Sequence, residues 1–136
     1  MKIKTFVAAL AVASGLVSCA SSRSAIDGRQ LLIVELNGTE YVSQGETPAN
    51  MAFSNGRCSA TVGGNIINAD YKEGKNGGLE FSMGLSTKMM VPESYREDEF
   101  VAAFNSISSY KASGDEVSFM DAEGKVLIKS KYQSGR

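Results

Sequence analysis

The sequence predicts an α+β domain that is mostly β: an antiparallel, partly open β-barrel-like sheet with one amphipathic helix packed against it. Two observations predict this fold class. From about Leu31 onward, short alternating segments are broken by Gly and Asn, a pattern typical of antiparallel strands joined by tight turns. Only the segment that begins at Pro92 has apolar residues at helical spacing instead.

The chain has 136 residues, of which 43% are hydrophobic and 21% charged, which is typical of one globular domain. We predict four segments: residues 1–18 as a lipoprotein signal peptide, 19–30 as a flexible tether, 31–132 as the domain and 133–136 as a C-terminal tail. The tether is predicted from a run of small polar residues that follows Cys19.

The N-terminus has the layout of a secretory signal peptide, with Lys2 and Lys4 before an apolar stretch that is too short for a comfortable membrane span. It ends in Leu16-Val17-Ser18-Cys19, which resembles the bacterial lipobox. We therefore expect cleavage before Cys19 and lipidation of its thiol, with palmitate-like chains anchoring the protein in a membrane. The residue after Cys19 is Ala20 and not Asp. In lipoproteins of Gram-negative bacteria this resembles a sorting signal for the outer membrane.

The first half of the domain predicts consecutive hairpins. The apolar run Leu31–Leu36 precedes a turn at Asn37-Gly38, and Asn55-Gly56 is a strong two-residue turn signal between two alternating segments. The sequence Gly63-Gly64-Asn65 interrupts the alternation and predicts a bulge or bend before a strand at 66–71. Its two glycines would equally suit the close approach of a ligand to the backbone. After the turn at 76–78, one strand is predicted with its buried face formed by Leu79, Phe81, Met83 and Leu85.

The second half predicts a helix followed by two strands. Pro92 suits a helix N-terminus, acidic residues follow it, and Phe100, Val101, Phe104 and Ile107 fall on one face. The two final strands are predicted around Val117 and Phe119 and around Val126 and Ile128, with a turn at 121–124 between them.

The order of motifs from about Leu32 to Tyr132 resembles the META domain family, which includes HslJ-like lipoproteins. The resemblance rests on the segment 53–57, on Gly63-Gly64-Asn65, and on the central segment 83–91 with Thr87 and Met89. It continues with the acidic-then-Phe pair Glu97 and Phe100, and with a final hairpin that begins at Tyr110. The resemblance implies a barrel-like domain packed by a helix in secreted or surface-tethered proteins loosely linked to the stress response, with no catalytic activity to transfer.

Two positions depart from the family pattern. The Cys of the family's Gly-Cys-Asn element is Gly64 here, and the Cys that ends the central segment is Val91. If these positions form a disulfide in relatives, this chain lacks it, and no redox or metal role is implied for the pair.

Composition excludes several functions. The chain has no His and a formal net charge of −1, so we expect no zinc site, no cofactor and no nucleic-acid partner. Cys58 alternates with Ala60 and Val62 and should be buried. The methionines Met83, Met89, Met90 and Met120 are expected to be core residues instead of a Cu(I) site.

The sequence therefore predicts a non-enzymatic, lipid-anchored module of the cell envelope that binds an unknown envelope protein or a hydrophobic ligand. Two alternatives remain open. A small enzyme could work with carboxylates alone, and would need two of them in one pocket. A structural accessory subunit of an outer-membrane complex would instead expose an apolar patch.

Overall fold

The structure is a computed structural model and describes residues 24–82 and 84–133. The predicted signal peptide, the lipidation site Cys19 and Met83 lie outside the described residues. The elements of the described part have these bounds: β1 Gln30–Leu36, β2 Thr39–Glu40, β3 Asn50–Ser54, β4 Arg57–Thr61, β5 Ile66–Glu73, the 3-10 helix η1 Lys75–Gly77, β6 Leu79–Phe81, β7 Leu85–Ser86, the 3-10 helix η2 Glu93–Tyr95, α2 Glu97–Ser106, β8 Ser109–Ser113, β9 Glu116–Met120 and β10 Val126–Tyr132.

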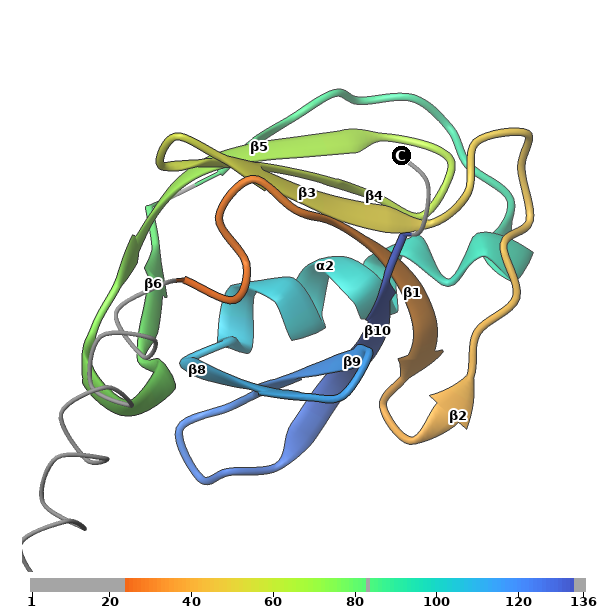
Figure 1. The fold of residues 1–136 in the computed structure, drawn as a ribbon. Coiled ribbons are helices and arrows are strands. Elements are labelled where there is room, and N and C mark those ends of the chain that lie inside the picture. The colour runs from red at the N-terminus through yellow and green to blue at the C-terminus, as the bar shows by residue number, and fades with distance from the viewer. Residues whose placement is uncertain (1–23, 83, 134–136) are drawn as a thin grey trace, which may run out of the picture.

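The strands form one antiparallel sheet that is nearly closed into a barrel. Their order is β6-β5-β4-β3-β1-β10-β9-β8, with β2 paired to β1 and β7 paired to β5. The two ends of this order meet at a seam, where Gly78 and Ser109 form an isolated bridge and the Leu79 amide donates to the Ser108 carbonyl at 3.0 Å. The sheet curves around α2 (Figure 1), which confirms the predicted fold class.

The predicted turns form for a clear local reason. Asn37 and Gly38 have φ values of 51° and 81°, and Asn55 and Gly56 have 50° and 81°. Both central residues of a type I′ turn need positive φ, and Asn and Gly adopt it most readily. The two hairpins β1–β2 and β3–β4 therefore follow directly from the sequence.

The core is aromatic and lies between α2 and the inner face of the sheet. Phe100 and Phe104 on α2 are fully buried, and the Phe104 ring lies 4.5 Å from that of Phe81 on β6. Phe53 on β3 stacks on Phe119 of β9 at 6.0 Å. Helix and sheet thus bury each other's apolar faces.

The single strand predicted over Leu79 to Leu85 is wrong, because the alternation breaks between its two halves. Phe81 is opposite Tyr71 on β5, whereas Leu85 is opposite Asn68. Between these two pairs the chain advances by four residues from β6 to β7 but by only three residues along β5. An extra residue moves the following side chains to the other face of the sheet, so Leu85 points outward and is 78% exposed.

Helical structure begins directly after Pro92, as predicted, but it is interrupted at Arg96, so α2 itself begins at Glu97. Pro92 precedes η2, and Arg96, with φ of 55°, separates η2 from α2. In a continuous helix the Tyr95 carbonyl would accept a bond from within the helix, but here it accepts one from the Tyr41 hydroxyl at 2.7 Å.

Three strands follow the helix instead of the predicted two, because β8 comes before β9. Its single large apolar residue, Tyr110, is followed by exposed residues, so it lacks the alternation that marks β9 and β10.

The domain also begins earlier than predicted, because residues 24–30 pack on the barrel and are not part of a free tether. The side chain of Ile26 is fully buried, and the Tyr132 hydroxyl donates to the Ala25 carbonyl at 3.0 Å. A buried isoleucine within a polar run carries no periodic signal.

Among the described residues, no helix is long and apolar enough to cross a membrane.

Candidate functional site

Three segments meet at the start of α2: the bend after β4, the loop after β7 and the first turn of the helix. Gly63 has φ of 108°, a backbone conformation that favours glycine. The Thr61 hydroxyl accepts a bond from the Gly63 amide and donates to the Asn65 carbonyl, both at 2.9 Å. The bend therefore turns Asn65 inward, where it is buried.

The Asn65 side chain joins the bend to the loop. Its Oδ1 accepts hydrogen bonds from the Met89 amide at 2.7 Å and from the Thr87 hydroxyl at 2.9 Å. Its Nδ2 donates to the Met89 carbonyl at 3.0 Å. Thr87 Oγ1 in turn accepts from the Ile66 amide. The loop is thus hydrogen-bonded to the barrel through its backbone.

Glu97 joins the helix to the same residue. Its two carboxylate oxygens accept from the Asn65 amide at 2.9 Å and from Asn65 Nδ2 at 2.6 Å. As the first residue of α2, Glu97 also lies where the helix dipole favours a negative charge. In the side-chain amide of Asn65, both N–H donors of Nδ2 and both acceptor positions of Oδ1 are therefore used.

Gly64 lies against Val91 and Glu97. A Cβ atom at position 64 would be 2.7 and 2.8 Å from the two methyl carbons of Val91 and 2.8 Å from Glu97 Oε1. The two positions at which the family pattern has Cys are thus neighbours, and glycine is required here because the valine methyl groups fill the space.

The motif residues predicted from sequence fall into three places. Six come together around Asn65, and we call them the motif cluster: Gly63, Gly64, Asn65, Thr87, Met89 and Glu97. Phe100 is a buried core residue. Tyr110 lies apart, and its hydroxyl donates to Glu73 Oε1 at 2.6 Å. Burial, followed by the bond to Glu73, raises the pKa of Tyr110 to about 12.

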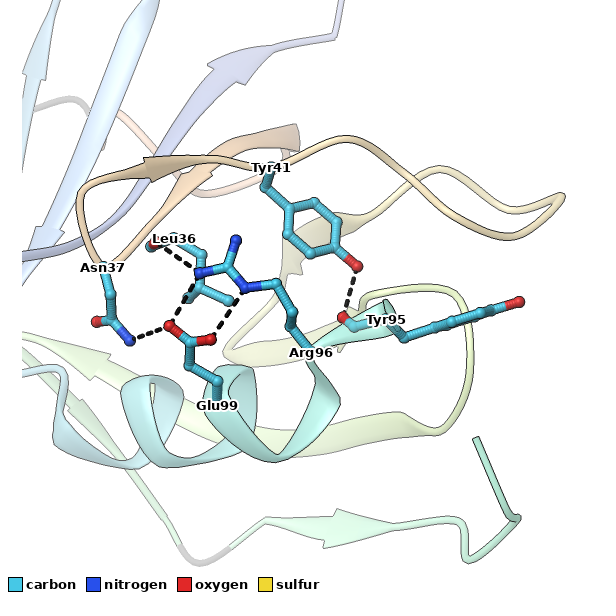
Figure 2. A network of polar contacts seen from close by, with 6 residues as sticks. All are labelled: Leu36, Asn37, Tyr41, Tyr95, Arg96 and Glu99. Atoms are coloured by element: carbon cyan, nitrogen blue, oxygen red, sulfur yellow. Dashed lines mark hydrogen bonds and ion pairs between the residues drawn. The ribbon is translucent and has the colours of Figure 1, made fainter. Parts of the chain in front are cut away.

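A second polar network, which the sequence analysis missed, connects the helix start to the β1–β2 turn (Figure 2). Arg96 donates to both carboxylate oxygens of Glu99 at 2.9 Å and to the Leu36 carbonyl at 3.1 Å. Asn37 Nδ2 also donates to Glu99 at 2.8 Å. The bonds from Arg96 and then Asn37 lower the pKa of the Glu99 carboxyl. The i,i+3 spacing of Arg96 and Glu99 was the available signal.

The segment of residues 85–91, which comprises β7 and the loop after it and which we call the motif loop, exposes apolar side chains. Met89 is 60% exposed and Met90 is 98% exposed, so the prediction that they are core residues is wrong. Met120 is half-buried. An open groove of about 530 Å³ lies beside the loop and is lined by residues 89–93 and 96–99.

Chemical reactivity is limited among the described residues. Cys58 is buried, and its burial raises the pKa of the thiol to about 12, so it has almost no thiolate character near neutral pH. No group of three or more Cys, Asp and Glu side chains in the described part could hold a metal ion.

Further open cavities flank Phe81 near the seam, and one of about 380 Å³ is lined by Phe81, Phe104 and Ile107 among others.

The comparisons with known proteins agree with this fold. The META domain family model matches residues 24–134. No curated protein matches the sequence. A protein solved by NMR is 17% identical with a TM-score of 0.62, over 78% of this chain and 90% of that one.

Two further solved structures are similar. An NMR structure of a protein from Burkholderia xenovorans is 17% identical with a TM-score of 0.61, over 81% of this chain and 85% of that one. A DUF4847 family protein from Bacteroides vulgatus is 13% identical with a TM-score of 0.56, over 80% and 95%. Identities of this size show similarity of fold alone.

Proposed function

We propose that this chain, which belongs to the META domain family, is a lipid-anchored module of the bacterial cell envelope that binds a partner protein through its motif loop and catalyses no reaction. The proposal combines the lipobox that ends at Cys19 with the surface that the motif cluster supports. It places the mature protein outside the cytoplasm, anchored in the outer membrane of a Gram-negative bacterium. A role under envelope stress is suggested by the family resemblance.

One observation supports the binding role above all: the motif loop holds apolar side chains in solvent. Leu85, Met89 and Met90 are 78%, 60% and 98% exposed, while hydrogen bonds to Asn65 hold the backbone of the loop in place. Burying one such side chain in an interface gains about 1.5–3 kcal/mol. Because the loop is already ordered, binding costs little conformational entropy.

The carboxylates near the loop support binding over catalysis. Both oxygens of Glu97 accept hydrogen bonds from Asn65. Glu99 is paired with Arg96, which lowers its pKa, whereas a carboxyl that acts as a general acid near neutral pH needs a raised pKa. The groove is also open and not enclosed, which suits a protein surface better than a small hydrophobic ligand.

Crosslinking in living cells tests the proposal. A photoreactive amino acid at Met90 of the full chain should give a discrete adduct with another envelope protein, and the same group at exposed Lys125 should not. Adding Met89→Asp and Leu85→Asp should abolish the adduct because charges replace the apolar contacts. Equal labelling from positions 90 and 125, or an adduct that survives both aspartates, contradicts a role for the motif loop.

Two further measurements test the lipid anchor and the alternative of a structural subunit. The intact mass of the mature protein should show a chain that starts at Cys19 with diacylglycerol and acyl additions, and these should be lost in Cys19→Ala. A structural subunit of an outer-membrane complex would use the same exposed apolar surface. It would co-purify with its neighbours in fixed ratio without a crosslinker, whereas a binding module would not.

A further inference from the structure

The folded domain is attached to its N-terminal segment at one defined place, beside the end of β5. The Ser24 hydroxyl donates to Glu73 Oε2 at 2.6 Å, while Tyr110 donates to the other oxygen of the same carboxylate. Two residues later, Ile26 is fully buried, and the Tyr71 hydroxyl donates to Asp27 at 2.9 Å. Any chain that precedes residue 24 therefore leaves the barrel next to Glu73.

This attachment lies at the opposite end of the barrel from the motif cluster. β5 runs from Ile66, next to Asn65, to Glu73, and eight strand residues cover about 23 Å. α2 runs in the same sense, from Glu97 in the cluster to Ser106, which precedes β8 and the seam (Figure 1). We call the end with Glu73, η1 and the start of β8 the anchor end, and the end with the motif cluster the motif end.

The chain between the lipidation site and the barrel is short compared with this length. Cys19 precedes Ser24 by five residues, and five residues span at most about 18 Å when fully extended. Turning the motif end onto the membrane would require the chain to reach past the whole length of β5. The covalent connection is too short for that inversion.

Charge favours the same orientation. At the anchor end, Lys72, Lys75 and Lys111 are exposed beside Glu73 and Glu80. The groove at the motif end is lined by four carboxylates, those of residues 93 and 97–99, and by one guanidinium, that of Arg96, and the motif loop adds one exposed lysine, Lys88. The motif end therefore keeps an excess of negative charge. A bilayer with anionic headgroups attracts exposed lysines and repels carboxylates.

We propose that the anchor end faces the lipid bilayer in which Cys19 is held, and that the motif loop faces away from it toward a partner in the aqueous compartment. This inference rests on the lipidation of Cys19 in the proposed function. It adds that the partner is met on the side away from the membrane. A short connection keeps Met89 and Met90 out of the lipid, where these apolar side chains would otherwise insert.

Depth-dependent quenching tests the orientation in the full lipidated protein. Single variants Lys75→Cys and Met90→Cys carry a thiol-reactive fluorophore at exposed positions, and Cys58 stays unlabelled because it is buried. The protein is reconstituted in phosphatidylethanolamine and phosphatidylglycerol vesicles whose headgroups carry a nitroxide quencher. We expect several-fold stronger quenching at position 75 than at position 90. Equal quenching, or stronger quenching at position 90, overturns the proposal.

A lengthened connection is the matched control. A Gly-Ser insertion of about twenty residues between Ser21 and Ser22 has an r.m.s. reach of about 25 Å, enough to let the domain turn over. The ratio of quenching between the two positions should then fall toward one. An unchanged ratio overturns the short connection as the cause of the orientation.

Different results contradict the lipid anchor and the proposed orientation. Intact mass reports lipidation whichever way the domain faces. A lipidated protein with equal quenching at both positions overturns the orientation alone, and a protein without lipid overturns the anchor.

Discussion

The side chain of Asn65 makes four hydrogen bonds to a loop and a helix that are both distant in sequence. We expect Asn65→Ala to lower the free energy of unfolding by about 2–4 kcal/mol, because it leaves buried partners unsatisfied. Urea denaturation of residues 24–136 measures the effect. Asn68→Ala, on the exposed face of β5, is the control and should change stability little. Equal losses of stability in both variants would show that the hydrogen bonds of Asn65 do not stabilise the fold.

The pair of Arg96 and Glu99 makes stability depend on pH. Because the folded state lowers the pKa of Glu99, the pair stabilises the protein above the unfolded pKa, and this contribution is lost as pH falls through the folded pKa. Glu99→Gln should therefore lower the urea midpoint at pH 7 but not well below the ordinary glutamate pKa of about 4.3. Glu123→Gln, in an exposed turn, should have no effect at either pH. A Glu99→Gln deficit that persists in acid would contradict the ion pair.

Single residues could be predicted where one local rule decides their environment. Cys58 is buried, as its alternation with Ala60 and Val62 indicates. For Met89 and Met90 the strand-like alternation around them predicts core positions, and this prediction is wrong. Hydrogen bonds from the Met89 backbone to Asn65 hold the loop backbone against the bend after β4, while the Met89 and Met90 side chains stay in solvent. The residue pattern contains no sign of these bonds.

Among the elements, the bend after β4 and the motif loop are close enough to be joined covalently. A Gly64→Cys, Val91→Cys double variant should form a disulfide, because a Cβ at position 64 reaches the Val91 methyl positions. The oxidised form should be about 2–4 kcal/mol more stable than the reduced form, measured by denaturation with and without reductant and by counting free thiols.

The single variant Gly64→Cys is the control for this disulfide. With Val91 still present, the new side chain meets its methyl carbons at under 3 Å, so this variant should be less stable than wild type. A double variant that keeps both thiols free under oxidising conditions would show that the two segments do not lie as described.

The hairpins and the bend at Gly63 were predictable from the sequence, but the shift between β6 and β7 and the break before α2 were not. Asn-Gly pairs mark the turns because both residues adopt positive φ. The shift between β6 and β7 depends on how many residues lie opposite β5, and a sequence pattern does not contain the pairing register. The start of α2 likewise depends on a bond from Tyr41, which lies far away in the chain.

At the scale of the whole molecule, the residues before β1 belong to the fold. Ile26→Ala should lower the free energy of unfolding by about 2–5 kcal/mol because it empties a fully buried site. Val42→Ala, where the side chain is 61% exposed, is the control. Urea denaturation decides between them, and equal effects would mean that the segment before β1 is not packed on the barrel.

The family resemblance names residues along the chain, but how they group in space needed the structure. Six of the motif positions form one cluster, while Tyr110 lies at the other end of the barrel beside Glu73. A linear motif records the order of residues along the chain. Which of them meet is set by the sheet order, in which β4 and β5 bring Asn65 to the start of α2.

The pairing of β1 with β10 has a consequence for folding. The first long strand forms five paired positions with the last one, from Leu31 with Tyr132 to Leu36 with Ile128, so barrel closure requires residues about a hundred positions apart to meet. Such long-range pairing gives a high contact order and folding on the millisecond-to-second scale. During synthesis the barrel stays open until its final strand has emerged, and a chain that ends before β10 leaves an edge of β1 unpaired and prone to aggregation.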